Sequence, residues 1–136
     1  TVEVIPGVTS AISAPLAAGI PVTHRGVTTG FIVMSGHEIG DLELAAKSDL
    51  TLVVLMGVGR LGKLVSGLVH GGKASSTPIA IIERAYAPDQ RVTVGTLESI
   101  VEIAAVEQVA NPAIIIVGDV VSVPTWLTAS VLTSHA

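Results

Sequence analysis

The chain has 136 residues and a formal net charge of -4, which are values typical of one compact domain. Hydrophobic residues make up 49% of it and aromatic residues only 2%, so Val, Ile, Leu and Ala must form the core. The acidic balance and the lack of a basic run argue against nucleic acid or an anionic membrane as a partner. The chain contains no cysteine, which excludes disulfides, zinc–thiolate sites and thiol catalysis within it.

Charged residues account for 13% of the chain, about half of the usual share for a globular domain. A surface with so few charges predicts that another domain or subunit covers part of it. No apolar run reaches the ~20 residues that a membrane helix needs. No signal peptide opens the sequence, so we expect a cytoplasmic protein. The chain enters a strand-like stretch directly after Thr1, as a piece of a longer protein would.

The first part of the chain predicts short strands that alternate with helices. The first helix has Thr9 or Ser10 as its N-cap, and it ends before Pro21, which cannot continue a helix. Residues 22–30 are polar and bounded by glycine, so we expect a loop or an irregular strand there. The predicted strands are Val2–Ile5, Phe31–Met34 and Thr51–Met56, and the predicted helices are Thr9–Ala18 and Leu42–Lys47.

The second part predicts an amphipathic helix and three more strands. The helix is indicated by Leu61, Leu64, Val65 and Leu68, whose spacing places them on one face. We expect strands over Pro78–Glu83, Arg91–Val94 and Ala113–Val117, the first two of which form a hairpin, and a helix over Leu97–Val109 capped by Thr96. The tail from Pro124 is compatible with a terminal helix or with disorder. The order of elements predicts an α/β fold with a mixed β-sheet flanked by helices.

One local motif is typical of dinucleotide binding. Residues Gly57–Gly62 read GVGRLG, which fits G-x-G-x-x-G between a predicted strand and a predicted helix. Glu83 ends the next strand, where such a fold has an acid that binds a ribose. The alternative is a tight turn that joins a strand to a helix, with glycines at left-handed positions. The motif lies in the middle of the chain, whereas a dinucleotide fold normally starts with it.

Other polar residues give weaker indications. No histidine has a partner at a spacing typical of metal ligands, so we expect no metal. No serine lies in a G-x-S-x-G motif, which removes the case for a hydrolase. His24 and Arg25 are adjacent in a predicted loop, and two such donors suit a polycarboxylate ligand, although a solvated loop explains them equally well.

A series of short segments, taken in order, is more specific than any one of them. The series is EVIPGVTSA at residues 3–11, GIPVTHRG at 19–26, SGH at 35–37, TLVVLMG at 51–57, PIAIIE at 78–83, QRV at 90–92, GTL at 95–97 and the strand after Pro112. This series resembles the tetrapyrrole methylase family, and within it the enzymes that methylate uroporphyrinogen III. The resemblance covers roughly residues 2–121, and GIPVTHRG is its most specific part.

The resemblance implies a fold of two α/β domains with a cleft between them, of which residues 1–136 form the C-terminal domain. Residues near 1–10 would form the inter-domain segment, and the N-terminal domain, with its glycine-rich GDP loops and proton-transfer groups, would be absent. The implied activity is S-adenosylmethionine-dependent C-methylation of uroporphyrinogen III to precorrin-2, on the way to sirohaem or cobalamin. The implied enzyme is a homodimer, and this part alone would be inactive.

The resemblance also implies site residues. Contacts to S-adenosylmethionine would come from Thr9 and Ser10 at a helix start, from Met56, and from Ala85. Ala85 departs from the family pattern, because Glu83-Arg84-Ala85 replaces Glu-Asn-Gly. The substrate or the domain interface would contact Thr23, His24 and Arg25. Two alternatives stay open at this point: an NAD-type domain that uses Gly57–Gly62, and a non-catalytic half-domain or dimerisation module.

Overall fold

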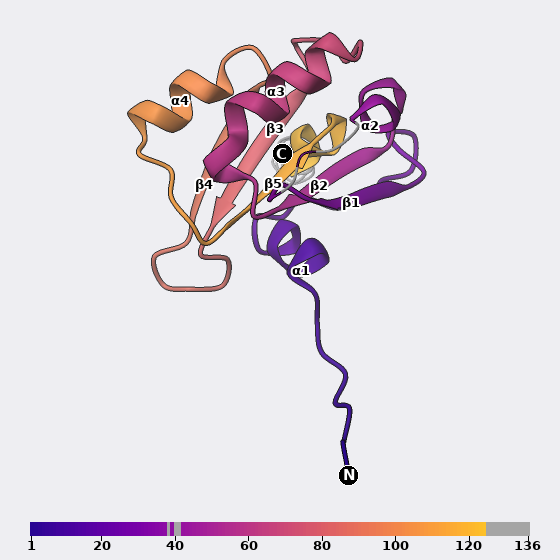
Figure 1. The fold of residues 1–136 in the computed structure, drawn as a ribbon, viewed down its shortest axis with the longest axis vertical. Coiled ribbons are helices and arrows are strands. Elements are labelled where there is room, and N and C mark those ends of the chain that lie inside the picture. The colour runs from indigo at the N-terminus through magenta and orange to yellow at the C-terminus, as the bar shows by residue number, and fades with distance from the viewer. Residues whose placement is uncertain (38, 40–41, 125–136) are drawn as a thin grey trace, which may run out of the picture.

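A computed structural model describes the chain except residues 38, 40–41 and 125–136 (Figure 1). One five-stranded sheet organises the domain, with strand order β1-β2-β5-β3-β4. Its strands are β1 (Phe31–Ser35), β2 (Thr51–Leu55), β3 (Pro78–Glu83), β4 (Arg91–Thr96) and β5 (Ala113–Val117). β1 and β2 are parallel, and β5 runs antiparallel to both β2 and β3, so the predicted mixed sheet is confirmed.

Helices cover both faces of this sheet, and three of them lie on one face (Figure 1). These are α2 (Glu43–Lys47), α3 (Leu61–His70) and α4 (Ile100–Val106). The predicted apolar stripe on α3 is confirmed, because its leucines and valine are buried against the sheet. Together these residues form the larger of two hydrophobic clusters, with Leu52, Val54, Ile79, Ile81 and Ile115 from the strands.

The other face carries α1 (Ser10–Ala17) and the short 3₁₀ helix η2 (Asp119–Ser122). Ala11 and Ala14 of α1 and Val120 and Val121 of η2 pack against the alternate residues of β2, β3 and β5. Thr9 is the N-cap of α1, since its side chain accepts a hydrogen bond of 3.2 Å from the Ala11 amide, so the predicted cap is confirmed. Among the described residues, no helix is both long and apolar enough for a membrane span.

The predicted strand over Val2–Ile5 is wrong for this structure. Residues 1–9 have no regular secondary structure and are all exposed, and Figure 1 shows them leading away from the sheet. A strand needs a partner for its backbone N–H and C=O groups, and none of the described strands pairs with this segment. The apolar side chains of the segment therefore lie in solvent, with Val2 at 91% exposure and Ile5 at 80%.

The helix predicted over Leu97–Val109 is also wrong at both ends, because α4 spans only Ile100–Val106. Thr96 is not its cap: β4 continues to Thr96, which lies opposite Pro78 in the β3–β4 hairpin. The Leu97 amide then donates to the Thr77 carbonyl at 3.0 Å, a bond that holds the next residues in a turn. The strand predicted over Arg91–Val94 is thus two residues longer in the structure, where it includes Gly95 and Thr96. The terminal helix or disorder expected for the tail after Pro124 concerns residues outside those that the structure describes.

Gly62 lies in α3 and Gly71 caps its C-terminal end, and the two differ in the space around them. This difference gives a testable prediction. An added Cβ at Gly71 would lie 2.5 Å from Ala46 Cβ of α2, whereas Gly62 has nothing within 4 Å. Gly71→Ala should therefore destabilise the protein by ~1–3 kcal/mol through overpacking. Gly62→Ala should instead stabilise it by up to ~1 kcal/mol, because alanine has the higher helix propensity. Chemical denaturation of both variants measures the difference, and equal effects would contradict the close packing of α2 on α3.

Candidate functional site

A cavity of about 850 Å³ lies where β1, β2 and β3 end. These strands point the same way because β2 and β3 are both antiparallel to β5, so their carboxyl ends share one edge of the sheet. The residues that follow each strand form the rim, and ligands in open α/β sheets bind outside this edge. The cavity is lined by Ser10, Ala14, Gly36, His37, Leu55, Met56, Gly59, Arg60, Ile82, Arg84, Ala85, Asn111, Pro112, Ala113 and Ile114. Its size and mostly apolar lining are typical of small-molecule sites.

The turn that follows β1 contacts the turn that follows β2, and both contain a glycine at the contact. An added Cβ at Gly36 would lie 2.4 Å from the Gly57 Cα, closer than any side chain allows. The Gly36 amide also donates to the Leu55 carbonyl at 2.6 Å, so the two strand ends are joined there. Only glycine permits this approach at Gly36, and the contact sets the shape of this part of the rim.

Two of the residues that line the cavity have backbones in the left-handed region. Met56 has φ 55° and Arg84 has φ 47°, and Tyr86, next to the lining residue Ala85, has φ 66°. Each such non-glycine residue costs ~1–3 kcal/mol, and residues of this kind concentrate at binding and catalytic sites. At Met56 the effect is to end β2 and leave the side chain 61% exposed at the cavity rather than in the core.

The structure brings together three of the four residues that were predicted to contact S-adenosylmethionine. Ser10, Met56 and Ala85 all line the cavity, although they are far apart in the sequence. The interpretation of Met56 as a core methionine is excluded by its exposure. Thr9 does not line the cavity; its side chain caps α1 and so fixes the helix start that carries Ser10.

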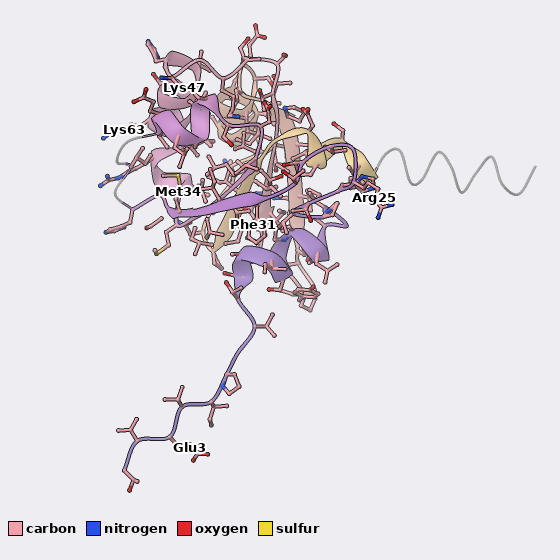
Figure 2. All side chains as sticks on the ribbon, turned by 90° about the vertical axis from the view of Figure 1, so that its right-hand side faces the viewer. Glu3, Arg25, Phe31, Met34, Lys47 and Lys63 are labelled. Atoms are coloured by element: carbon pink, nitrogen blue, oxygen red, sulfur yellow. The ribbon has the colours of Figure 1, made fainter. Side chains whose placement is uncertain are left out.

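The predicted substrate residues lie elsewhere. Thr23, His24 and Arg25 precede β1, and a bridge between His24 and Thr28 closes their loop. The Thr28 hydroxyl donates to the carbonyls of Gly30 and Asp49, which lie before the amino ends of β1 and β2. Met34 lies near the carboxyl end of β1, and Figure 2 shows Arg25 on the opposite side of the molecule from Met34. These three residues do not line the cavity.

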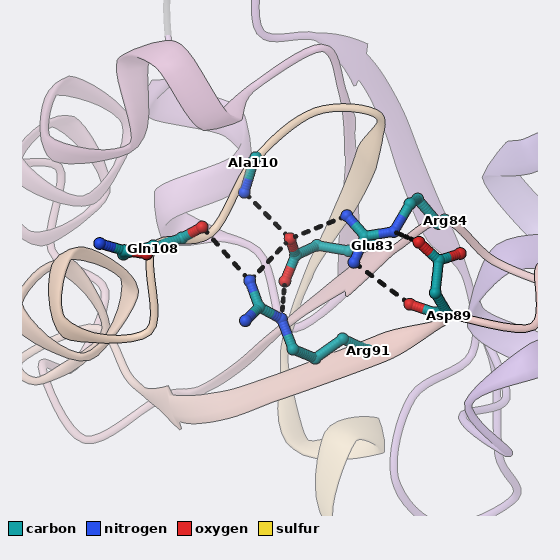
Figure 3. Close-up of polar contacts among 6 residues, drawn as sticks. All are labelled: Glu83, Arg84, Asp89, Arg91, Gln108 and Ala110. Atoms are coloured by element: carbon teal, nitrogen blue, oxygen red, sulfur yellow. Dashed lines mark hydrogen bonds and ion pairs between the residues drawn. The ribbon is translucent and has the colours of Figure 1, made fainter.

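A buried carboxylate network borders the cavity (Figure 3). The Glu83 side chain is fully buried, and it accepts hydrogen bonds from Arg91 Nε at 2.6 Å, from Arg91 Nη2 at 3.0 Å and from the Ala110 amide at 3.0 Å. Arg84 Nη1 lies 3.5 Å from the same carboxylate. The hydrogen bonds from Arg91, with smaller help from Ala110 and the charges, lower the pKa of Glu83 against the opposing effect of burial, so it is ionised at neutral pH.

This network contradicts the dinucleotide interpretation of Gly57–Gly62. That interpretation needs a free acid at Glu83 to bind a ribose, but Glu83 is enclosed by protein donors. It also needs the last glycine for close helix packing, whereas Gly62 has open space around it. The motif instead forms a 3₁₀ turn, η1 (Val58–Arg60), before α3 begins.

The site contains residues that the sequence analysis did not place in it. His37, Arg60 and Arg84 add cationic or titratable groups, and Asn111 and Pro112 form the wall beside β5. His37, Arg60 and Arg84 each follow the end of a strand, and this position predicts a place in the site once the strand directions are known. No sequence pattern predicts that β5 lies antiparallel between β2 and β3, so the contribution of β5 to the site is visible only in the structure.

Comparison with known proteins identifies the family to which the fold belongs. Residues 1–101 match the family described as Tetrapyrrole (Corrin/Porphyrin) Methylases. An S-adenosyl-L-methionine-dependent uroporphyrinogen III methyltransferase of Methanosarcina barkeri is 50% identical over 126 residues, which are 88% of this chain and 49% of that protein. A siroheme synthase of Psychrobacter cryohalolentis is 42% identical, over 88% of this chain and 24% of its own length.

A solved structure with a similar fold was determined in complex with a ligand. Uroporphyrin-III C-methyltransferase from Thermus thermophilus, in complex with S-adenosylhomocysteine, is 41% identical with a TM-score of 0.76, over 89% of this chain and 54% of that one. The chain thus spans about half the length, or less, of the relatives it matches. The matched family residues, the mixed sheet and these relatives agree, and the chain belongs to the tetrapyrrole methylase family.

Proposed function

We propose that the protein containing this chain transfers methyl groups from S-adenosylmethionine to carbon atoms of uroporphyrinogen III. One observation carries the proposal: Ser10, Met56 and Ala85, which the family resemblance assigns to the methyl donor, line one cavity of suitable size. The names of the relatives support the same substrate and donor. The relative solved with S-adenosylhomocysteine supports the donor independently.

The residues of the cavity fit such a donor. Ser10 is the first residue of α1 and lines the cavity, where its hydroxyl can bind polar edges of a ligand. Met56 offers an exposed, polarisable thioether as an apolar wall. Ala85 is small and half-buried, which leaves room for a flat ring beside the backbone. Among the described residues no group of three or more potential ligands could hold a metal ion, and we propose a reaction without one.

The contribution of this chain to the reaction is positioning and exclusion of water. The bound donor would supply a methyl carbon on a positively charged sulfur, which keeps the electron pair of the carbon–sulfur bond as a ring carbon of the substrate bonds to the methyl group. The apolar walls from Leu55, Ile82 and Ile114 hold water away from the reacting atoms. The ring proton released afterwards would pass to groups of the N-terminal domain, so we assign no catalytic residue here.

Substrate recognition needs donors for a polycarboxylate. Arg60 and His37 are exposed at the cavity and can bind carboxylate groups of a substrate that lies next to S-adenosylmethionine. We keep Thr23, His24 and Arg25 as substrate contacts from the other end of the sheet, where a second domain or subunit would have to complete the site. The product would be precorrin-2, after methylation at two ring positions. The similarity to siroheme synthases supports the sirohaem route, and cobalamin synthesis uses the same product.

The remaining parts of the enzyme are proposals as well. We propose that residues 1–136 are the C-terminal domain of a cytoplasmic homodimer, that residues near 1–10 connect it to the N-terminal domain, and that it is inactive alone. The exposed Val2, Val4, Ile5 and Val8 support the connection, because apolar side chains in such a run are normally covered.

The activity of the isolated chain tests the proposed division of the enzyme. Residues 1–136 alone should not turn over uroporphyrinogen III in a methyl-transfer assay, because the N-terminal domain would hold the proton-transfer groups. Addition of the purified N-terminal domain in trans is the matching control. Turnover by the isolated chain would contradict the proposal that the catalytic groups lie outside it.

Met56→Lys tests the donor site. It places a second cation beside the positive sulfur, so the affinity for S-adenosylmethionine should fall at least tenfold, which is ~1.4 kcal/mol. Folding should be unaffected because Met56 is 61% exposed. Isothermal titration of the full-length protein measures the affinity, with Val106→Lys as a matched control, since Val106 is 75% exposed on α4. Unchanged affinity in the Met56 variant would remove this residue from the site.

A second pair of variants separates the donor site from the G-x-G-x-x-G motif. Gly59 lines the cavity, but an added Cβ there meets nothing within 4 Å, so Gly59→Ala should change donor affinity by less than about threefold, or ~0.7 kcal/mol. Ala85→Leu adds bulk to the wall and should weaken binding by more than about tenfold. Titration of both variants with S-adenosylmethionine decides between the proposed donor site and the G-x-G-x-x-G motif. Loss of binding in Gly59→Ala with no effect of Ala85→Leu would overturn the assignment.

A further inference from the structure

Glu83 is a charged group without a role in the proposed reaction. Its carboxylate is fully buried at the end of β3, and a buried charge is costly even when it is paired. Replacement of a whole buried ion pair by apolar residues is often neutral or stabilising, so the Glu83–Arg91 pair is weak evidence for a role in stability alone. The presence of Glu83 therefore calls for a function other than core stability.

The partners of Glu83 come from the two walls of the cavity. On one side, Arg84 follows Glu83 directly and leads to Ala85. On the other side, the Ala110 amide donates to Glu83 at 3.0 Å, just before Asn111 and Pro112. Figure 3 shows the Glu83 side chain between these segments, with Arg91 below it. The Arg84 amide also donates to the Pro112 carbonyl at 3.0 Å, so the two walls are joined beside the buried carboxylate.

The same contacts hold residues in unfavourable backbone conformations. Arg84 has φ 47°, and its guanidinium lies between Glu83, at 3.5 Å, and the Asp89 carboxylate, at 2.7 Å. Gln108 has φ 53°, and its carbonyl accepts a hydrogen bond of 3.3 Å from Arg91, which is itself held by Glu83. Such conformations persist only where the surroundings fix them, and Glu83 contacts Arg84 directly and Gln108 through Arg91.

We propose that Glu83 is a positioning residue for the methyl-donor cavity: through Arg91 and the Ala110 amide it fixes both walls at the separation that the donor needs. This inference rests on the proposed function, because the ligand is the donor assigned there. It differs from a role in stability, since it requires a local effect on the two walls. It also differs from catalysis, since Glu83 does not line the cavity.

The test uses Glu83→Gln in the full-length protein, a change that keeps the size of the side chain and removes its charge. Two controls accompany it. Glu102→Gln makes the same chemical change on an exposed face of α4. Leu68→Ala lowers global stability from within the larger hydrophobic cluster, at a residue that does not line the cavity. For each variant, hydrogen exchange of the Arg84, Ala87 and Ala110 amides is measured without ligand, and S-adenosylhomocysteine binding is measured by titration.

Glu83→Gln should speed exchange at these three amides at least tenfold relative to the amides of α3, and it should raise the Kd for S-adenosylhomocysteine about tenfold. Leu68→Ala should speed exchange throughout the domain and leave the Kd unchanged while the protein is folded. Uniform exchange in Glu83→Gln, or an unchanged Kd, would overturn the positioning role. Absence of binding by the wild type would instead contradict the proposed function, and the exchange comparison, which needs no ligand, would still decide whether Glu83 holds the walls.

Discussion

The insertion of β5 between β2 and β3 is the constraint on which the rest of the structure depends. All five residues of β5 are buried, and the strand forms hydrogen-bonded ladders with both neighbours. Because it runs antiparallel to both, β2 and β3 point the same way while they are separated by one strand. The ends of β2 and β3 therefore cannot close on each other, and the start of β5 leaves Asn111, Pro112 and Ala113 between them as part of the cavity wall.

This arrangement explains why the cavity combines an apolar interior with polar segments at the rim. Ile82 and Ile114, which lie opposite each other in neighbouring strands, continue the core directly into the cavity. The chain must then reverse or turn within one or two residues of each strand end. It does so through glycine at Gly36 and through left-handed conformations at Met56 and Arg84. Two of the described non-glycine residues with left-handed backbones therefore line the cavity, where a rigid sheet can hold such conformations.

The parts of this fold that follow from periodicity could be predicted from the sequence. The stripe on α3, the buried strands and the β3–β4 hairpin are encoded by local apolar patterns. Partnering is not local, which is why Val2–Ile5 was predicted as a strand although no described strand pairs with it. The same limit applies to the site. The family resemblance predicts Met56 and Ala85 as site residues, whereas the strand order in the structure is needed to place Arg60 and Pro112 beside them.

The G-x-G-x-x-G segment shows how strand order decides the chemistry of a motif. In a dinucleotide fold the strand before the motif and the strand with the acid are adjacent and parallel, so the acid reaches the ligand. Here β5 separates β2 from β3, and Glu83 lies between Arg91 and Ala113 in the two ladders rather than at an open crevice. The Glu83 carboxylate is fully buried in that place and binds the protein donors Arg91 and Ala110. The glycines then serve a 3₁₀ turn, and the acid that would have bound a ribose holds the cavity wall instead.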